Sequence, residues 1–261
     1  MISAERRFRS TVPHYVAGRL RYPPGLIAAV AGALALDGSG RLLDLGCGPG
    51  FLAIAFAPYV AEVVAMDPEP DMLAAAQEAA RGQAGRFTFV LGGSQDLAPA
   101  LGRFSLVTMG RSFHWMDREK TLATLDTMIE PNGGVALFGD RHPNVPENAW
   151  HKAWRAIRDR YAEDDPRPHD RDHEAVLRRS PFSALRLLTE RVQRRTSLDE
   201  MVARALSLST TSPERLGQAR AAFEAELRAA LAPYAEGGAV SELVEALALL
   251  ATRPERSEAA T

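Results

Sequence analysis

The first 140 residues alternate short apolar runs with segments whose apolar positions recur at helical spacing. The apolar runs are rich in β-branched, aromatic and leucine residues, which predicts buried strands. We expect strands at 41–45, 62–66, 86–91, 104–109 and 135–139. Helical patterns occupy 26–36 and 50–59, the segment that begins at Pro70, and 117–129. Strands separated by helices indicate an α/β fold with a doubly wound, mostly parallel sheet.

The pattern changes after residue 140. Residues 141–182 are helical in pattern, heavily charged and interrupted by prolines, which indicates a helical insertion after the fifth strand. We expect a sixth strand at 183–193. Ser197 with Glu200 forms a capping box ahead of a helix, and Ser212–Pro213 opens another helix that runs to about Ala232. Residues 241–252 have the composition of a helix and the position of a last strand, and both alternatives stay open.

Composition limits the class of protein. The chain has 261 residues, of which 46% are hydrophobic and 25% charged, and a formal net charge of −2. That balance gives no reason to expect a nucleic-acid or membrane partner. The first residues lack the apolar run of a secretory signal, and the apolar segment 26–36 is too short to span a bilayer. We expect a single cytoplasmic domain over 1–261, with a flexible tail at 253–261.

The run LLDLGCGPG at 42–50 ends a predicted strand in an acid and a glycine loop. Two residues argue against a bound pyrophosphate. Phe51 stands where the dinucleotide fingerprint needs a third glycine, and Asp44 lies where a phosphate would be repelled. The pattern of a phosphate-binding loop, which ends in Gly-Lys-Ser/Thr, is absent from the sequence. A glycine loop beside a carboxylate instead suits a ligand with a positive group, which the backbone at Gly46, Gly48 and Gly50 can approach closely.

A second acid agrees with this interpretation. Asp67 ends the second predicted strand, 19 positions beyond Gly48, where a carboxylate accepts hydrogen bonds from a ribose diol. A nucleoside joined to a cation, without phosphate, describes S-adenosylmethionine.

The motifs resemble, in order, those of the class I S-adenosylmethionine-dependent methyltransferases. The matching segments are LLDLGCGPG, VVAMDPEPDM, VLGGSQDL, FSLVTMGRSFHWMD and EPNGGVALF, although Asn132 interrupts the usual turn of the last. The segments SFHWMD and TVPHYVAGRLRYP are most similar to the small-molecule branch that includes trans-aconitate methyltransferase. The resemblance implies a Rossmann-like, seven-stranded sheet, a helical N-terminal lid over 1–25 and a substrate-selecting insertion over 141–182.

The resemblance also implies which residues hold S-adenosylmethionine. Gly93 stands where the family often has an acid for the adenine amino group, so Ser94 and Gln95 become the candidates for that contact. Cys47, inside the loop, is interpreted as a small space-filling residue rather than a nucleophile. The expected cofactor-binding residues are Asp44, Gly46, Cys47, Gly48, Asp67, Pro68, Met72, Ser94, Gln95 and Arg111.

His114 is the candidate catalytic residue. It follows the fourth strand, at the edge of the sheet where ligands bind, and imidazole titrates near neutral pH. It is interpreted equally well as a general base or as a residue that orients its loop. Arg111 has three interpretations: a partner for an acidic substrate, a partner for the methionine carboxylate, or a surface arginine.

The candidate substrate-binding residues come from the predicted lid, from the loop after the fourth strand and from the insertion. Trp150 and Trp154 are four apart on a helix, so they fit a core stripe equally well. His169 and His173 have metal-ligand spacing, but their charged surroundings favour a solvated face, and we expect no metal. The candidates are Tyr15, Arg19, Tyr22, Trp115, His142 and Trp150.

Some acceptors are disfavoured. After the fourth strand the chain has GRSFHW, where amino-methylating nucleic-acid enzymes carry an Asp/Asn-Pro-Pro-aromatic run. Cytosine C5 enzymes need a catalytic cysteine, but the single cysteine of this chain lies in the glycine loop. We therefore expect a small-molecule acceptor that is methylated on oxygen, nitrogen or carbon. Two alternatives stay open: a module that binds S-adenosylmethionine without turnover, and a nicotinamide-dependent oxidoreductase.

Overall fold

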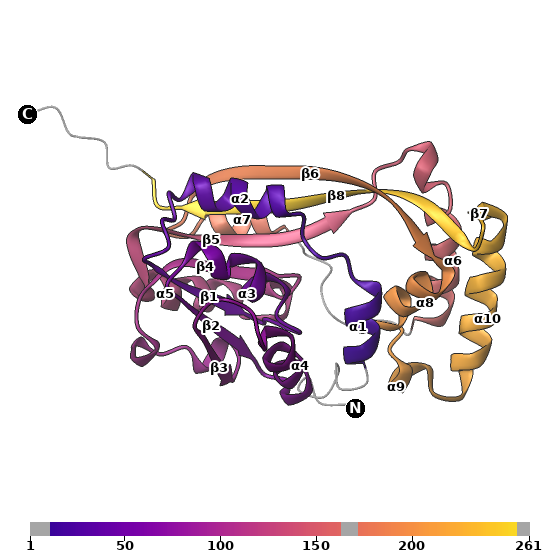
Figure 1. Cartoon of the computed structure of the whole chain (residues 1–261), viewed down its shortest axis with the longest axis horizontal. Coiled ribbons are helices and arrows are strands. Elements are labelled where there is room, and N and C mark those ends of the chain that lie inside the picture. The colour runs from indigo at the N-terminus through magenta and orange to yellow at the C-terminus, as the bar shows by residue number, and fades with distance from the viewer. Residues whose placement is uncertain (1–10, 163–171, 255–261) are drawn as a thin grey trace, which may run out of the picture. The chain divides into compact units, whose positions relative to one another are not determined.

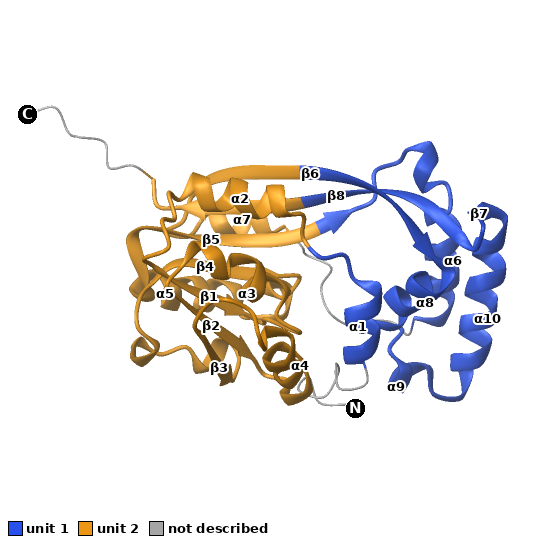
Figure 2. Ribbon diagram, viewed as in Figure 1, with its two compact units in different colours: residues 1–21, 140–169, 190–246 blue, residues 22–139, 170–189, 247–261 orange. Residues whose placement is uncertain are grey.

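The computed structural model describes residues 11–162 and 172–254, which form two units (Figure 2). Unit 1 comprises residues 1–21, 140–169 and 190–246, and unit 2 comprises residues 22–139, 170–189 and 247–261. Residues 1–10 of the expected lid, His169 and residues 255–261 of the expected tail lie outside the described residues. The domain boundaries inferred from the sequence stay a prediction.

The central sheet has the expected doubly wound topology (Figure 1). Its order is β3-β2-β1-β4-β5-β8-β6, and the pairs β1–β2, β1–β4, β2–β3 and β4–β5 are parallel. The short β7 pairs with β8 in antiparallel register. The α/β class and the seven-stranded path are thereby confirmed. The strands are β1 Arg41–Leu45, β2 Glu62–Asp67, β3 Phe87–Leu91, β4 Phe104–Gly110, β5 Ile129–Arg141, β6 Ala184–Ser197, β7 Ala235–Glu236 and β8 Ala239–Thr252.

In unit 2, alternate residues of the strands face opposite layers of helices. One face, which includes Leu43, Val64 and Val107, packs against α5 and α7. On the other face, Phe138 packs against Phe56 of α3, with ring centroids 5.8 Å apart. The helices of this unit are α2 Pro24–Ala33, α3 Phe51–Phe56, α4 Pro70–Ala80, α5 Arg118–Met128 and α7 His173–Arg178.

Unit 1 has a helical core of its own, formed around two tryptophans. Trp150 and Trp154 are buried with Met201 of α8 and with Phe223 and Leu227 of α10. In addition, α1 approaches α8 so closely that a Cβ at Gly18 would lie 2.1 Å from the backbone nitrogen of Arg204. The helices of this unit are α1 Val12–Gly18, α6 His151–Tyr161, α8 Leu198–Leu206, α9 Pro213–Leu216 and α10 Arg220–Leu231.

Two local features differ from the expectation. The turn expected at EPNGG lies inside β5, because residues 130–133 bulge opposite Ser105 while the pairing resumes at Gly134. The helix expected over 213–232 is broken at Gly217, which has a φ of +50°. Residues 241–252, for which the sequence left a helix and a strand both open, form a strand within β8.

Candidate functional site

The glycine loop follows β1 and rests on the end of β2. The backbone N–H groups of Gly46 and Cys47 both donate to the carbonyl of Met66. Gly46, Gly48 and Gly50 have φ values of +70°, +53° and +82°, which residues with a side chain rarely adopt. A Cβ at Gly48 would meet nothing closer than the Met72 Sδ atom, 4.0 Å away. The backbone of Gly48 therefore borders open space in which a ligand fits.

Asp44 is buried at the carboxyl end of β1, on the face that α3 covers. Its Oδ1 accepts a hydrogen bond from the Thr108 hydroxyl at 2.9 Å, and its Oδ2 accepts one from the Ala53 N–H at 3.0 Å. Burial raises the pKa of Asp44 to about 7, because these two hydrogen bonds offset only part of the desolvation, and the nearby Asp67 raises it further.

Asp67, at the end of β2, forms a hydrogen bond to the glycine loop. Its Oδ2 accepts a hydrogen bond from the Gly48 N–H at 2.8 Å, and its Oδ1 accepts one from the Glu69 N–H at 2.9 Å. Burial raises the pKa of Asp67, although these two hydrogen bonds oppose the rise. Each oxygen of a carboxylate has about two acceptor sites, so Asp67 retains the capacity to accept from two ribose hydroxyls.

Cys47 is buried in the loop, and its Sγ lies 3.4 Å from the Gly48 carbonyl oxygen. Burial raises the pKa of the Cys47 thiol well above its usual range, and Asp44 and Asp67 add to the rise. A thiol in this environment stays protonated and is a poor nucleophile.

The other predicted cofactor-binding residues of unit 2 lie on segments that follow β2 and β3. Met72 is buried in α4, below Gly48, and Pro68 is exposed between β2 and α4. Ser94 and Gln95 begin a short 3-10 helix, where the Gln95 side chain lies over the backbone of Gly93. Asp96 stabilises the start of this 3-10 helix, because its Oδ2 accepts a hydrogen bond from the Gly93 N–H at 2.9 Å.

Arg111 follows β4 in an unusual conformation. Its φ is +57°, in the left-handed region that residues with a side chain seldom occupy, and its N–H donates to the Phe138 carbonyl. The guanidinium carbon lies 4.7 Å from the centroid of the Tyr22 ring. Tyr22 is itself buried, edge-on to Phe138. Strained backbone of this kind is concentrated at ligand sites.

His114 lies in a 3-10 turn, Phe113–Trp115, directly after the β4 segment. Its ring is half-buried, with the Trp115 ring centroid 5.0 Å away and the His173 ring stacked at 6.4 Å. Phe113 is buried beneath this group and contacts His173 edge-on. His173, which the sequence assigned to a solvated face, therefore packs against the candidate base.

The substrate candidates Tyr15, Arg19, His142 and Trp150 lie in unit 1. Tyr15 belongs to α1, and Arg19 caps that helix while its Nε donates to the Ser207 hydroxyl at 2.7 Å. His142 Nε2 lies 3.0 Å from Oε2 of Glu242, which is fully buried. His142 therefore contacts the ion pair described next.

Arg204 and Glu242 form a buried ion pair within unit 1. The guanidinium donates to both carboxylate oxygens, at 2.7 and 2.8 Å, and its Nε donates to the Gly18 carbonyl at 3.1 Å. Burial alone would raise the pKa of Glu242, but hydrogen bonds from Arg204, His142 and Thr196 outweigh it and hold the pKa well below its usual range. The pair ties α1, α8 and β8 together.

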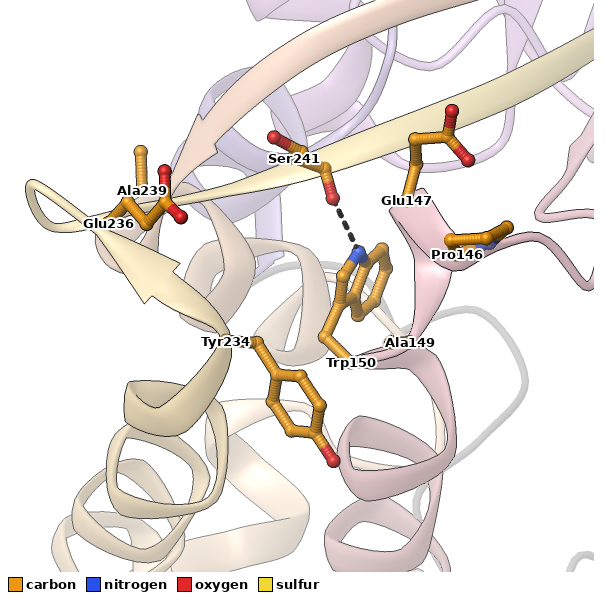
Figure 3. A pocket seen from close by; sticks show the side chains of 8 residues that line it. All are labelled: Pro146, Glu147, Ala149, Trp150, Tyr234, Glu236, Ala239 and Ser241. Atoms are coloured by element: carbon orange, nitrogen blue, oxygen red, sulfur yellow. Dashed lines mark hydrogen bonds between the residues drawn. The ribbon is translucent and has the colours of Figure 1, made fainter.

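Trp150 lies in the core of unit 1 and also lines a pocket of about 190 Å³ (Figure 3). Its indole N–H donates to the Ser241 carbonyl at 2.9 Å, which fixes the ring, and the Tyr234 ring lies on the opposite side. Next to it on the chain, His151 stacks on His142 with centroids 5.1 Å apart. Burial, followed by the influence of His142, lowers the pKa of His151 to about 4, so this ring is neutral at neutral pH.

Sequence reasoning missed several residues that support the site. Thr108 lies in a predicted strand, and Arg204 lies in a predicted helix, but no local pattern distinguishes either from its neighbours. Ser112 lies opposite Gly46 and donates to the Leu45 carbonyl at 2.8 Å. The one available signal was Glu242, which with Glu245 is one of two acids inside a largely apolar segment.

The described residues contain neither a metal-binding cluster nor a helix suited to span a membrane. Residues 11–162 and 172–254 contain no group of three histidine, cysteine or acidic side chains arranged to hold a metal ion. Within the same ranges, no helix has the length and hydrophobicity needed to cross a bilayer.

The doubly wound sheet carries a glycine loop between the carboxylates of Asp44 and Asp67, the arrangement from which the sequence motifs predicted a methyltransferase. Residues 42–133 match the family model described as a methyltransferase domain. The match confirms a methyltransferase domain over this part of the chain, as the sequence motifs predicted.

Two curated relatives carry related names. An uncharacterised methyltransferase-like protein of Schizosaccharomyces pombe is 26% identical over 163 residues, which are 62% of this chain and 61% of that protein. A malonyl-[acyl-carrier protein] O-methyltransferase of Pseudescherichia vulneris is 32% identical over 117 residues, which are 44% of each chain. The chain thus matches less than two thirds of the length of either relative.

The fold is also similar to that of a solved structure. A methyltransferase of Geobacter sulfurreducens, in complex with S-adenosyl-L-homocysteine, aligns with a TM-score of 0.55 at 17% identity. The alignment covers 97% of this chain and 100% of that one, and at this identity it shows the shared fold.

Proposed function

We propose that this protein transfers the methyl group of S-adenosylmethionine to a small-molecule acceptor, on oxygen, nitrogen or carbon. The observation that carries the proposal is the pair of buried carboxylates, Asp44 and Asp67, at the ends of two adjacent parallel strands. They flank the glycine loop, whose glycines have φ values in the left-handed region. The backbone of a glycine loop can approach a ligand closely. The two carboxylates beside the loop favour a cationic ligand without phosphate.

The residues present fit this cofactor. Asp67 would accept hydrogen bonds from the ribose hydroxyls, and Gly46, Gly48 and Cys47 would contact the ligand through their backbone. Met72 and Pro68 would border the adenosine, with Ser94 and Gln95 at the adenine. Arg111 would pair with the methionine carboxylate, which its position after β4 and its strained backbone support.

When bound, the cofactor supplies an activated methyl group for an in-line displacement. The chain must then align the acceptor, exclude water and, where the acceptor carries a proton, remove it. We assign the proton transfer to His114, with Trp115 as a wall of the acceptor site. An imidazole suits this role because it is partly neutral near pH 7.

The acceptor class follows from charge and from relatives. The net charge of −2 offers no attraction for nucleic acid. The Pseudescherichia relative is by name a malonyl-[acyl-carrier protein] O-methyltransferase, so the acyl group in its name is small although a carrier protein bears it. We propose an acceptor group of comparable size, consistent with the small-molecule branch that includes trans-aconitate methyltransferase. Tyr15, Arg19, Tyr22, His142 and Trp150 are the proposed determinants of acceptor choice.

Asp67→Ala is the test of the cofactor site. The variant should bind S-adenosylmethionine roughly ten- to a hundred-fold more weakly, because it loses charge-assisted hydrogen bonds worth a few kcal/mol. Isothermal titration calorimetry on the folded variant measures this. Glu78→Ala removes an exposed carboxylate of α4 and should leave the affinity unchanged.

Three results would contradict parts of the proposal. Unaltered affinity in Asp67→Ala would remove Asp67 from the site. Tight binding of NAD by the wild type would favour a nicotinamide-dependent oxidoreductase, and binding of S-adenosylmethionine without methylation of any acceptor in a broad screen would favour a binding module without turnover.

A further inference from the structure

Asp44 is a fully buried acid of the proposed cofactor site. The side chain is 1% exposed and receives two hydrogen bonds, one from a hydroxyl and one from a backbone amide. Within the described part of the chain, no ion pair joins it to a lysine, arginine or histidine. An ionised carboxylate buried in this way lacks a counter-charge, which is costly.

The titratable groups around Asp44 offer no counter-charge. Asp67 approaches from β2 and disfavours a second negative charge, whereas the protonated thiol of Cys47 in the loop carries no charge. The other two neighbours, Thr108 on β4 and Ala53 on α3, contribute a hydroxyl and an amide without net charge. The surroundings of an ionised Asp44 therefore favour the binding of one positive charge nearby.

We propose that Asp44 is the residue by which this site selects the sulfonium donor over its thioether product, and that it does so only when it is ionised. This inference rests on the proposed function. S-adenosylmethionine and S-adenosylhomocysteine share the adenosine and the amino acid and differ by one methyl group and one positive charge. The ratio of their dissociation constants therefore isolates the interaction of the site with the sulfonium.

The direction of the pH dependence follows from burial. With the pKa of the free protein's Asp44 raised to about 7, the carboxyl is largely neutral near pH 6 and largely ionised above pH 8. Because the folded pKa lies above the ordinary value, this group makes the free protein less stable as pH rises from about 4 to about 7. A bound cation reverses that loss and releases a proton.

The experiment is a calorimetric titration of the full chain with each ligand separately, near pH 6 and near pH 8.5. Buffers of different ionisation enthalpy are used, so that released protons are counted. For the wild type, the preference for S-adenosylmethionine over S-adenosylhomocysteine should rise by roughly five- to tenfold between these two pH values. Near pH 7, S-adenosylmethionine should release more protons than S-adenosylhomocysteine.

Substitutions at Asp44 and at Thr108 assign the effect to Asp44. In Asp44→Asn the preference should be independent of pH, and the difference in proton release should vanish. Thr108→Val removes a donor that stabilises the ionised carboxylate, so the midpoint should move to higher pH, while Thr108→Ser should restore it. Circular dichroism confirms that each variant is folded.

The outcomes separate this inference from the proposed function. A wild type that binds neither ligand at any pH contradicts the proposed function. Binding of both ligands with a preference that does not change with pH leaves the proposed function intact and overturns the inference. The same holds if Asp44→Asn retains the wild-type pH dependence.

Discussion

Glu242→Ala is expected to lower the free energy of unfolding of unit 1 by about 3–5 kcal/mol, the cost of breaking a buried ion pair. The substitution leaves the guanidinium of Arg204 buried without its carboxylate, and it removes the acceptor of Thr196 and the partner of His142. Urea denaturation measures the loss. Tryptophan fluorescence is a suitable signal, because two of the three tryptophans, Trp150 and Trp154, lie in unit 1.

The control is Glu236→Ala. Glu236 also carries a carboxylate in unit 1, but its side chain is 90% exposed, so the change should stay within about 0.5 kcal/mol. Because the pKa of Glu242 is depressed, the stability it contributes is present above pH 4.5 and declines as the pH falls below that value. The difference between wild type and Glu242→Ala should therefore shrink in acid. A loss below 1 kcal/mol at neutral pH would show that the pair contributes little.

His114→Ala is expected to slow turnover on a hydroxyl or carbon acid by on the order of 10²-fold or more, while the affinity for S-adenosylmethionine stays nearly unchanged. The reason is that imidazole removes the acceptor proton during transfer. The slowing should be smaller at high pH, where the acceptor loses its proton to water. The measurement is kcat against pH, with an acceptor identified by a substrate screen.

His114→Gln separates a base from an orienting residue, because glutamine retains a hydrogen-bonding group but accepts no proton at these pH values. Wild-type turnover in His114→Gln across the pH range would assign His114 to loop orientation. An acceptor that is already deprotonated, such as a carboxylate, needs no base, and His114→Ala should then change KM more than kcat.

Local patterns predicted the parts of the site that depend on neighbours in sequence. The loop after β1 requires glycine at left-handed positions, and Asp67 ends a strand whose apolar run is readable by itself. Thr108 could not be found in this way. It meets Asp44, 64 positions earlier in the chain, only because β1 and β4 pair in parallel with these two residues in register. His142 and Glu242, 100 positions apart, are a similar case.

The segment 241–252 shows a limit of propensity. Its leucines, alanines and glutamates favour a helix, yet it forms most of β8 between β5 and β6. There its backbone groups find partners on both sides, and its side chains are largely buried. Such tertiary context overrides a preference of a few tenths of a kcal/mol per residue.

The order of the strands also has a consequence for synthesis on the ribosome. β8 fills the gap between β5 and β6, and both of these neighbours precede it in the chain. Until residues 239–252 emerge from the exit tunnel, the nascent protein carries two long strand edges with unpaired backbone groups, which are templates for aggregation. Closure of the sheet is thus a late event in biogenesis, and chaperones that shield strand edges should engage this chain before its final strand is made.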